Sequence, residues 1–311
     1  MKRLSFVVKA LVRSAFQMCG LQVTRIPAHP HPVAALSPLR VGCYTVLTDS
    51  EALRHAYETS PEVNSVITRL VAALISGSTS AAMIDIGANC GDSVALAKSG
   101  GPVSVLCVDG DPTVCELLRR NVAQFAGVTV REVLLGETVG TISAEIIKAG
   151  WNSTLVTDNI SDPKQISLDT LDRVVSTWEA LPRLRFIKCD AEGFDVRILF
   201  GARATLTTRR PVLLFEYNRD AMALTGEPGF RVFSYLREVG YSRVLFYDDR
   251  GRFLCAASLE DTTLLCDLHD YADGRRGEVC YYDVVAFHAS DDSLSVGFID
   301  EERRRRVTTD G

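Results

Sequence analysis

The sequence predicts an α/β protein whose core is a mostly parallel β-sheet with helices on both faces. From residue 81 onward, short apolar runs alternate with helical patterns, which is typical of βα units on a parallel sheet. Acidic residues and glycines directly follow several of these runs, where the strands of such a sheet end. Hydrophobic residues make up 47% of the chain and charged residues 23%, so the chain can bury a substantial core, which excludes a disordered protein.

Seven apolar runs are predicted to be strands of this sheet. No recognisable crossover helix separates the last two runs, so we expect them to be antiparallel neighbours at one edge, with the last strand reversed. The seven runs are Met83–Ile86, Val103–Val108, Val128–Leu135, Arg185–Cys189, Pro211–Phe215, Arg243–Tyr247 and Tyr281–Phe287.

Helix signals separate these strands. Asp92 is the expected N-cap of the first helix, and Asp111 followed by Pro112 is the expected N-cap and first turn of the second. Residues 232–239 carry apolar side chains at helical spacing and are followed by a glycine. Residues 136–156 follow a less regular pattern and are predicted to contain turns.

The chain is expected to consist of an N-terminal extension (1–59), a main domain (60–290) and a polar, frayed tail (291–311). Residues 1–26 place apolar side chains on one face of a helix and lysines on another, and several prolines follow in a linker. We expect the helix to pack on its own domain or to pair with a second copy of the chain. Weak contact with an anionic membrane surface is the alternative.

Composition narrows the choice of compartment and partners. The formal net charge is −5, which is not typical of a protein that binds nucleic acid, and no apolar run reaches the ~18 residues of a membrane-spanning helix. The nine cysteines include no C-x-x-C pair. Cys107, Cys189 and Cys280 lie in apolar runs and are expected to be buried reduced thiols, which favours a cytoplasmic protein.

A glycine turn and an acid after the next strand indicate a nucleoside site. Gly87 and Gly91 follow the first strand, where glycine allows a tight turn and a close approach of backbone to a ligand. Asp109 follows the second strand, 24 residues after Asp85, near the offset at which an acid binds ribose hydroxyls in nucleotide-binding folds.

The details of this turn favour S-adenosylmethionine over a dinucleotide. The turn lacks the G-x-G-x-x-G spacing that admits a pyrophosphate, and Asn89 stands where a phosphate would have to come close. Asp85 adds negative charge beside the turn, which suits a ligand with an ammonium group. A G-x-x-x-x-G-K-[ST] loop for a nucleoside triphosphate is absent from the sequence.

Five segments in order resemble the motifs of the FkbM methyltransferases. This resemblance implies a Rossmann-like class I methyltransferase fold, S-adenosylmethionine as the methyl donor and a hydroxyl oxygen as the acceptor. The chain departs from the usual family pattern in having Asp109-Gly110 where Glu-Pro is common. The segments are Ile84–Asp92, Val108–Pro112, Ser167–Asp172, Ile187–Asp195 and Pro211–Glu216.

Eight residues are therefore predicted to contact the cofactor, and three carboxylates are candidates for catalysis. The cofactor residues are Asp85, Gly87, Asn89, Gly91, Asp92, Asp109, Gly110 and Asp190, and the catalytic candidates are Asp190, Glu192 and Glu216.

Each catalytic candidate also has a structural interpretation. The alternative role of Asp190 is to cap the next helix, that of Glu192 is to complement the helix dipole, and that of Glu216 is to pair with a basic side chain. Their positions at strand ends favour a site role for Asp190 and Glu216. Lys188 is a candidate partner for one of these acids, and Asn218 a weaker candidate for binding acceptor hydroxyls.

The sequence thus predicts an S-adenosylmethionine-dependent O-methyltransferase acting on a small molecule, a sugar or a glycan, without a metal ion. Two alternatives stay open. One is an NAD-type oxidoreductase with the same layering, and the other is a non-catalytic binding module that keeps the cofactor fold.

Overall fold

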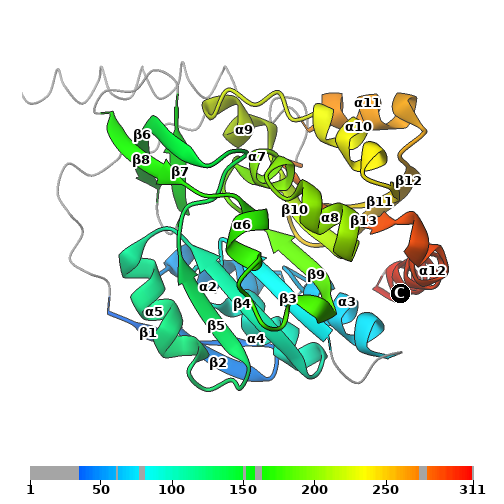
Figure 1. Cartoon of the computed structure of the whole chain (residues 1–311). Helices are drawn as coiled ribbons and strands as arrows, with labels where there is room; N and C mark the ends of the chain where they lie inside the picture. The colour runs from blue at the N-terminus through cyan, green and yellow to red at the C-terminus, as the bar shows by residue number, and fades with distance from the viewer. Residues whose placement is uncertain are drawn as a thin grey trace, which may run out of the picture. The chain divides into compact units, whose positions relative to one another are not determined.

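A large twisted sheet forms the centre of the structure, a computed structural model that describes residues 35–60, 62–76, 81–149, 152–157, 163–272 and 279–309. Its eight strands lie in the order β12-β11-β13-β10-β9-β3-β4-β5 (Figure 1). These strands are β3 (Ala81–Ile86), β4 (Val103–Asp109), β5 (Val128–Glu132), β9 (Leu184–Cys189), β10 (Val212–Tyr217), β11 (Tyr241–Asp248), β12 (Phe253–Ser258) and β13 (Tyr282–His288).

The strand directions confirm the predicted Rossmann-like fold. Strands β5, β4, β3, β9 and β10 are parallel to one another, whereas β13 lies between β10 and β11 and is antiparallel to both. All seven predicted strands are present and the last is reversed, as expected. The count of seven is corrected to eight, because β12 adds an antiparallel edge strand beside β11.

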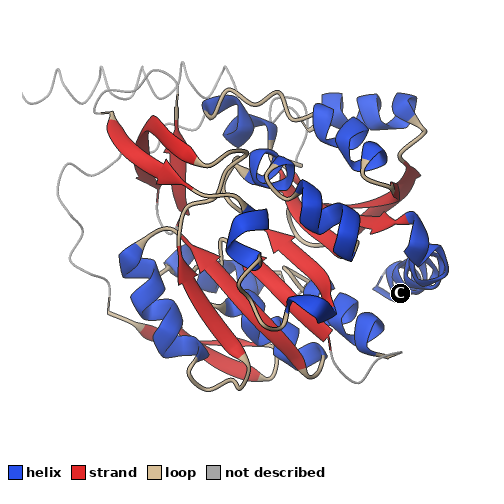
Figure 2. Ribbon diagram, in the orientation of Figure 1, coloured by secondary structure: helices blue, strands red, loops and turns tan. Residues whose placement is uncertain are grey.

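Helices cover both faces of this sheet, as Figure 2 shows. One hydrophobic core lies beneath α6 (Leu171–Val175), α7 (Asp195–Phe200), α8 (Arg203–Arg209), α9 (Arg219–Leu224), α10 (Arg231–Glu238) and α11 (Thr262–Tyr271). The other lies beneath α2 (Glu51–Thr59), α3 (Val66–Ile75), α4 (Asp92–Gly100), α5 (Pro112–Val122) and α12 (Asp292–Thr309). Because β3 is covered on both sides, all six of its residues are buried, and five of them are apolar, Asp85 being the exception.

The predicted helix starts are largely confirmed. The side chain of Asp111 accepts a hydrogen bond from the Thr113 amide at 2.8 Å, and Pro112 occupies the first turn of α5. The N-cap of α4 is Gly91 rather than Asp92, because Gly91 adopts a left-handed backbone with φ of +85° and Asp92 is the first helical residue.

A second, three-stranded sheet occupies the region that the sequence predicted to be irregular. It has the order β7-β6-β8, all antiparallel, and comprises β6 (Gly140–Ala149), β7 (Asn152–Val156) and β8 (Lys164–Leu168). Along one face of β6, Ile142 and Ala144 pack into the core, while Ile146 is 42% exposed. The sheet is therefore anchored at one end and open at the other.

The main domain begins earlier and ends later than the predicted range 60–290. Residues 36–311 form one compact unit, which includes a hairpin of β1 (Ser37–Val41) and β2 (Tyr44–Thr48). The expected frayed tail is instead the helix α12, which buries Phe298 and Ile299. Glu302 of α12 is 2% exposed and pairs with Arg69, with 2.5 Å between Oε1 and Nε.

The expectations for residues 1–34, an amphipathic helix and most of a proline-rich linker, lie outside the described residues. Among the residues that the structure does describe, no helix is both long enough and apolar enough to cross a membrane. Cys107 and Cys189 are buried free thiols as expected, but Cys280 is exposed because it precedes β13 instead of lying within it.

Asn121 joins the N-terminal hairpin to the rest of the unit. Its side-chain amide donates to the carbonyls of Leu47 and Cys90, both at 2.8 Å, and its oxygen accepts from the Leu47 amide at 2.9 Å. Asn121 is 4% exposed, so water has little access to the three backbone groups that its side chain bonds.

We predict that Asn121→Ala lowers the free energy of unfolding by about 2–3 kcal/mol, because it leaves three backbone groups without their partner. Urea denaturation measures the effect. The matched control is Gln124→Ala, because Gln124 donates to the Thr45 carbonyl of the same hairpin from an exposed position. This control is expected to cost less than about 1 kcal/mol, and equal losses in the two variants would contradict the assignment.

Candidate functional site

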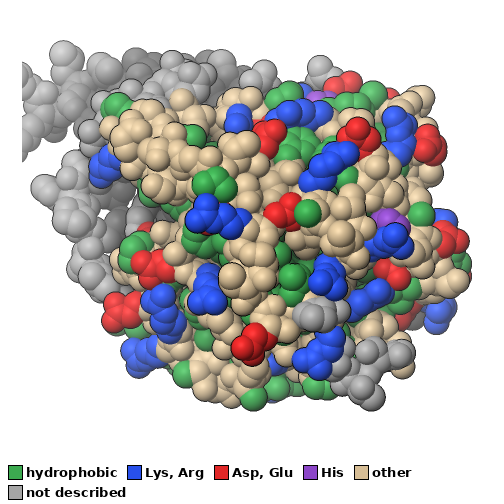
Figure 3. Space-filling model, viewed as in Figure 1, with side chains coloured by type: hydrophobic (Ala, Val, Ile, Leu, Met, Phe, Trp, Pro, Cys, Tyr) green, Lys and Arg blue, Asp and Glu red, His purple; other side chains and the backbone are tan. Residues whose placement is uncertain are grey.

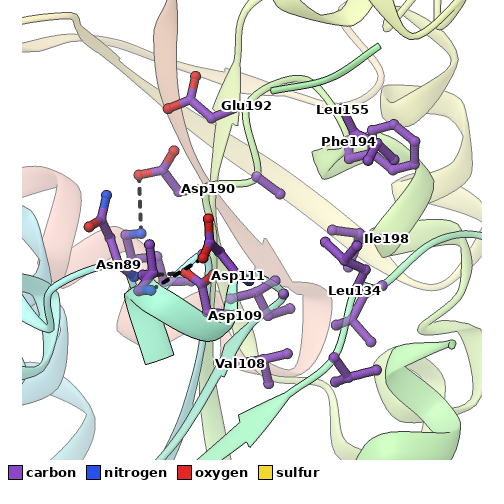
Figure 4. A pocket seen from close by; sticks show the side chains of 18 of the residues that line it. Asn89, Val108, Asp109, Asp111, Leu134, Leu155, Asp190, Glu192, Phe194 and Ile198 are labelled. Atoms are coloured by element: carbon purple, nitrogen blue, oxygen red, sulfur yellow. Dashed lines mark hydrogen bonds and ion pairs between the residues drawn. The ribbon is translucent and has the colours of Figure 1, made fainter. Parts of the chain in front are cut away.

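One pocket lies beyond the carboxyl ends of β3, β4 and β9, at the edge where ligands bind in open α/β sheets (Figure 4). Seven of the predicted site residues line it together: Gly87, Asn89, Asp92, Asp109, Gly110, Asp190 and Glu192. The loops that follow different strands therefore form one cavity.

Gly87 brings the loops after β3 and β9 into contact. It has a φ of +69°, and a Cβ atom at this position would lie 1.8 Å from the carbonyl oxygen of Asp190. The Gly87 amide donates to the carbonyl of Val108 at 2.9 Å, and the Asp190 amide donates to that of Ile86 at 3.1 Å. Both the conformation and the space thus require glycine.

Asp109 is held at the end of β4 by backbone amides. Its two carboxylate oxygens accept from the amides of Asn89 at 3.1 Å and Asp111 at 3.0 Å. Burial raises the pKa of Asp109, while these two amides act in the opposite direction. Each carboxylate oxygen of Asp109 can accept a further hydrogen bond, so the oriented carboxylate can bind a pair of ribose hydroxyls.

An apolar wall faces these polar groups. Figure 4 shows Leu134, Leu155, Phe194 and Ile198 across the cavity from Asp109. They come from the segment after β5, from β7, and from the start and interior of α7. A polar edge opposite an apolar wall suits a nucleoside, whose base is flat and apolar on its faces.

Lys188 lies between two carboxylates at the floor of the pocket. Its Nζ is 3.1 Å from Oδ2 of Asp190 and 3.6 Å from Oδ1 of Asp85. Burial opposes the charged form of Lys188, but Asp190 and Asp85 outweigh it and raise its pKa. The predicted role of Lys188 as a partner of these acids agrees with this geometry.

Asp85 lies behind the pocket wall and is not among the lining residues. It is fully buried and accepts a hydrogen bond from the Ser93 hydroxyl. Burial raises its pKa to about 6, although Lys188 acts to lower it. In this position Asp85 fixes Lys188, so its predicted direct contact with a cofactor stays a prediction.

The loop after β9 is held in an unusual conformation. Glu192 lines the pocket with a φ of +51°, a region that non-glycine residues seldom adopt. The buried carboxylate of Asp195 accepts from the amides of Ala191 at 3.1 Å and Gly193 at 3.2 Å. Burial, together with the charge of Asp190, raises the pKa of Asp195 to about 7. Asp195 therefore fixes the segment that carries Glu192.

Glu216 lies outside the lining of this pocket but belongs to the same acidic region. It is directly opposite Asp283 on the neighbouring strand β13, and the charges of Asp190 and Glu192 also act on it. Burial, followed by these charges, raises the pKa of Glu216 well above its usual value. Its Oε1 is buried without a hydrogen-bond partner in the described part of the protein.

Several functional candidates were missed in the sequence. Burial and the charge of Asp190 raise the pKa of Asp283 to about 7, and its only signal was a carboxylate in an apolar run. Asn64 lines the pocket from the start of the predicted main domain, and Tyr57, in the segment assigned to the extension, contacts the pocket residue Asp92. Asn218 has a structural role instead, because its side chain caps α9 by accepting from the Ala221 amide at 3.1 Å.

Gly91 is the remaining predicted cofactor residue. Gly91 does not line the pocket and packs near Leu118 and Val122 of α5, so its effect on a ligand is indirect. Within the described ranges, no group of three or more His, Cys, Asp or Glu side chains is arranged to hold a metal ion.

We predict that Gly87→Ala removes ligand binding at this pocket and lowers the free energy of unfolding by about 2 kcal/mol or more, since the added methyl group meets a backbone oxygen. Thermal denaturation checks the second effect. Gly140→Ala is the control, because a Cβ there meets nothing within 4 Å. A Gly87→Ala protein as stable as this control would show that the two loops are not in contact.

The methyltransferase FkbM domain model matches residues 85–243 of the sequence, just over half of the chain. No curated protein matches it significantly. A crystal structure of methyltransferase FkbM from Methylobacillus flagellatus is 20% identical over 62% of this chain and 47% of that one, with a TM-score of 0.37. The chain thus spans about half the length of that protein.

Two further solved structures are similar. Human methyltransferase 10 domain containing protein is 12% identical over 91% of this chain and 95% of that one, with a TM-score of 0.37. M. capricolum TrmK, solved with S-adenosyl-homocysteine, is 11% identical over 71% and 66%, with a TM-score of 0.35. The family match lies on the strands and loops that build the pocket, and the chain belongs to the FkbM methyltransferase family.

Proposed function

We propose that the protein transfers a methyl group from S-adenosylmethionine to a hydroxyl oxygen of a small molecule or a sugar. The observation that carries this proposal is one pocket that combines an apolar wall, the oriented Asp109 carboxylate and the acidic side chains of Asp190 and Glu192 after β9. Membership in the methyltransferase family supports it and disfavours the oxidoreductase alternative.

The residues present fit the cofactor. Asp109 would bind the ribose hydroxyls, and the wall formed by Leu134, Leu155 and Ile198 would cover the adenine. Asn89 and the turn around Gly87 would lie against the methionine part. S-adenosylmethionine, when bound, supplies a methyl group on a sulfonium that is a good leaving group.

The protein's contribution to such a transfer is mainly orientation. The positive charge disperses as the carbon–sulfur bond breaks, so negative charge at the sulfur stabilises the ground state as much as the transition state. Holding the acceptor in line with that bond contributes several kcal/mol. Lys188 offsets the charge of Asp190 at 3.1 Å, which suits this requirement.

An alcohol acceptor must also lose its proton, and Glu216 is the residue best suited to take it. A carboxylate with a raised pKa is a stronger base than an ordinary one. Burial and the charges of Asp190, Asp195, Glu192 and Asp283 raise the pKa of Glu216.

The surface supports a small-molecule or glycan acceptor over a nucleic acid. Figure 3 shows Lys and Arg side chains scattered among Asp and Glu on the face in view, without one continuous basic patch. The net charge of −5 has the same implication. A cytoplasmic location remains part of this proposal.

Isothermal titration with S-adenosylhomocysteine tests the cofactor assignment. We expect micromolar binding to the wild-type protein, no binding of NAD, and a loss of about 30-fold or more in Asp109→Ala, because two ribose hydroxyls lose a charged acceptor. The control is Asp300→Ala, since Asp300 is exposed on α12. Failure of the wild-type protein to bind S-adenosylhomocysteine would overturn the proposed function.

Glu216→Gln tests the proton acceptor, with radiolabelled S-adenosylmethionine and a panel of monosaccharides and phenols as acceptors. We expect kcat to fall by about 100-fold or more while the affinity for S-adenosylhomocysteine is kept. In the wild-type protein, kcat/KM should rise with pH through the raised pKa of Glu216, because only the deprotonated base is active, and the Gln variant should lack this rise.

Glu238→Gln is the matched control, because Glu238 is exposed and pairs with Arg203 away from the pocket. Unchanged turnover in Glu216→Gln would remove Glu216 from the mechanism.

A further inference from the structure

Tyr57 contacts a pocket-lining residue from a segment that precedes the family match. It lies near the end of α2, and its hydroxyl donates to Oδ2 of Asp92, 35 residues later, at 2.7 Å. Asp92 is the first residue of α4, is 6% exposed and lines the pocket. A residue in the N-terminal part of the unit thus contacts the carboxylate at the start of the first helix after the glycine turn.

The hydroxyl of Tyr57 is fixed as a hydrogen-bond donor. Burial, followed by the charge of Asp92, raises its pKa well above the usual value, so it keeps its proton. The side chain of Asn64 is near enough to the same hydroxyl to act on its pKa, in the lowering direction. Asn64 itself lines the pocket with a φ of +55°, a conformation that asparagine tolerates better than most residues and that often occurs at functional sites.

Asp92 differs from the other acids at this end of the pocket in its contacts. Asp85 and Asp190 both lie within 3.6 Å of the Lys188 ammonium. The contacts of Asp92, by contrast, are with the Tyr57 hydroxyl and, at 3.8 Å, the thiol of Cys90. In the part of the chain that the structure describes, Asp92 has no cationic partner within salt-bridge distance, and the Lys188 ammonium acts on it only from farther away.

A buried carboxylate without a cationic partner is suited to a cationic ligand. The charge is costly to bury alone, and a ligand ammonium would offset that cost. Asp92 also lies in the first turn of α4, where the helix dipole favours negative charge. A hydrogen bond from a rigid phenol fixes the carboxylate in one orientation before the ligand arrives.

We propose that Tyr57 is a positioning residue, which with Asn64 orients the Asp92 carboxylate to receive the ammonium group of the methionine part of the cofactor. This inference rests on the proposed function. It makes the segment from α2 to Asn64 part of the cofactor site and gives it a specific task, recognition of the amino-acid end of the ligand and not of its nucleoside.

The test compares two ligands by isothermal titration on the full chain. S-adenosylhomocysteine carries the amino-acid end, whereas 5′-methylthioadenosine keeps the adenosine and the sulfur but lacks it. Tyr57→Phe should weaken the binding of S-adenosylhomocysteine by about tenfold. The affinity for 5′-methylthioadenosine should stay within twofold of that of the wild-type protein. Asp92→Asn should weaken the binding of S-adenosylhomocysteine by about 100-fold and again leave the affinity for 5′-methylthioadenosine unchanged.

Tyr44→Phe is the control, because Tyr44 lies in β2 and packs on Phe125 away from the pocket. It should change neither affinity. Asn64→Ala provides a second variant that keeps the Tyr57 ring in place, and it should repeat the selective loss in weaker form.

Equal weakening of both ligands in Tyr57→Phe would show that Tyr57 only supports the fold, and no weakening of either would show that it does not act on Asp92. Both results would overturn the inference and leave the proposed function standing. Wild-type protein that binds neither ligand would instead overturn the proposed function itself, and with it this inference.

Discussion

The contact between Gly87 and the carbonyl of Asp190 is the constraint on which the site depends. A side chain at residue 87 would meet that oxygen at 1.8 Å, so the two loops can approach only because residue 87 has none. The approach places the turn after β3 against the segment after β9, while the Gly87 amide binds the end of β4 through Val108. Three strand ends are thereby fixed around one cavity, and side chains distant in the sequence become neighbours.

The charged side chains at the cavity form two groups, one around Lys188 and one around Glu216. Lys188 lies on the central strand β9 and is shared by Asp85 and Asp190, so two of the acids nearest the floor are offset. Farther along, Glu216 and Asp283 face each other on antiparallel strands, and burial raises the pKa of both. The site thus has a floor where one ammonium partly offsets two carboxylates, and beside it a facing pair of carboxyl groups with raised pKa values.

The central strands could be predicted from the sequence because strands buried on both faces are continuous apolar runs. The smaller elements lie at the margins of the fold, where this signal is weak. Strand β12 is an edge strand with half-buried residues, and β6 alternates between buried and exposed positions. Helix α12 contains a run of four arginines, so its few buried residues did not suggest that it packs on the domain.

The site residues also divide into those that the sequence predicted and those that it did not. Residues that immediately follow strands, such as Asp109 and Asp190, were predictable because the edge of the sheet gathers them. Tyr57 and Asp283 come from opposite ends of the chain, and their neighbours in space are set by packing and strand register, which local sequence does not reveal. Asp85 is fully buried with Ser93 and Lys188 as its partners, and its position in the strand did not reveal these two contacts.

Hydrogen exchange on the full chain, with and without saturating S-adenosylhomocysteine, tests most directly whether these three loops form one cofactor site. The account predicts that the amides of residues 87–92, 109–111 and 190–193 become protected together when the ligand binds. Protection confined to one of these segments, or located instead around the hollow between β12 and α12, would contradict it.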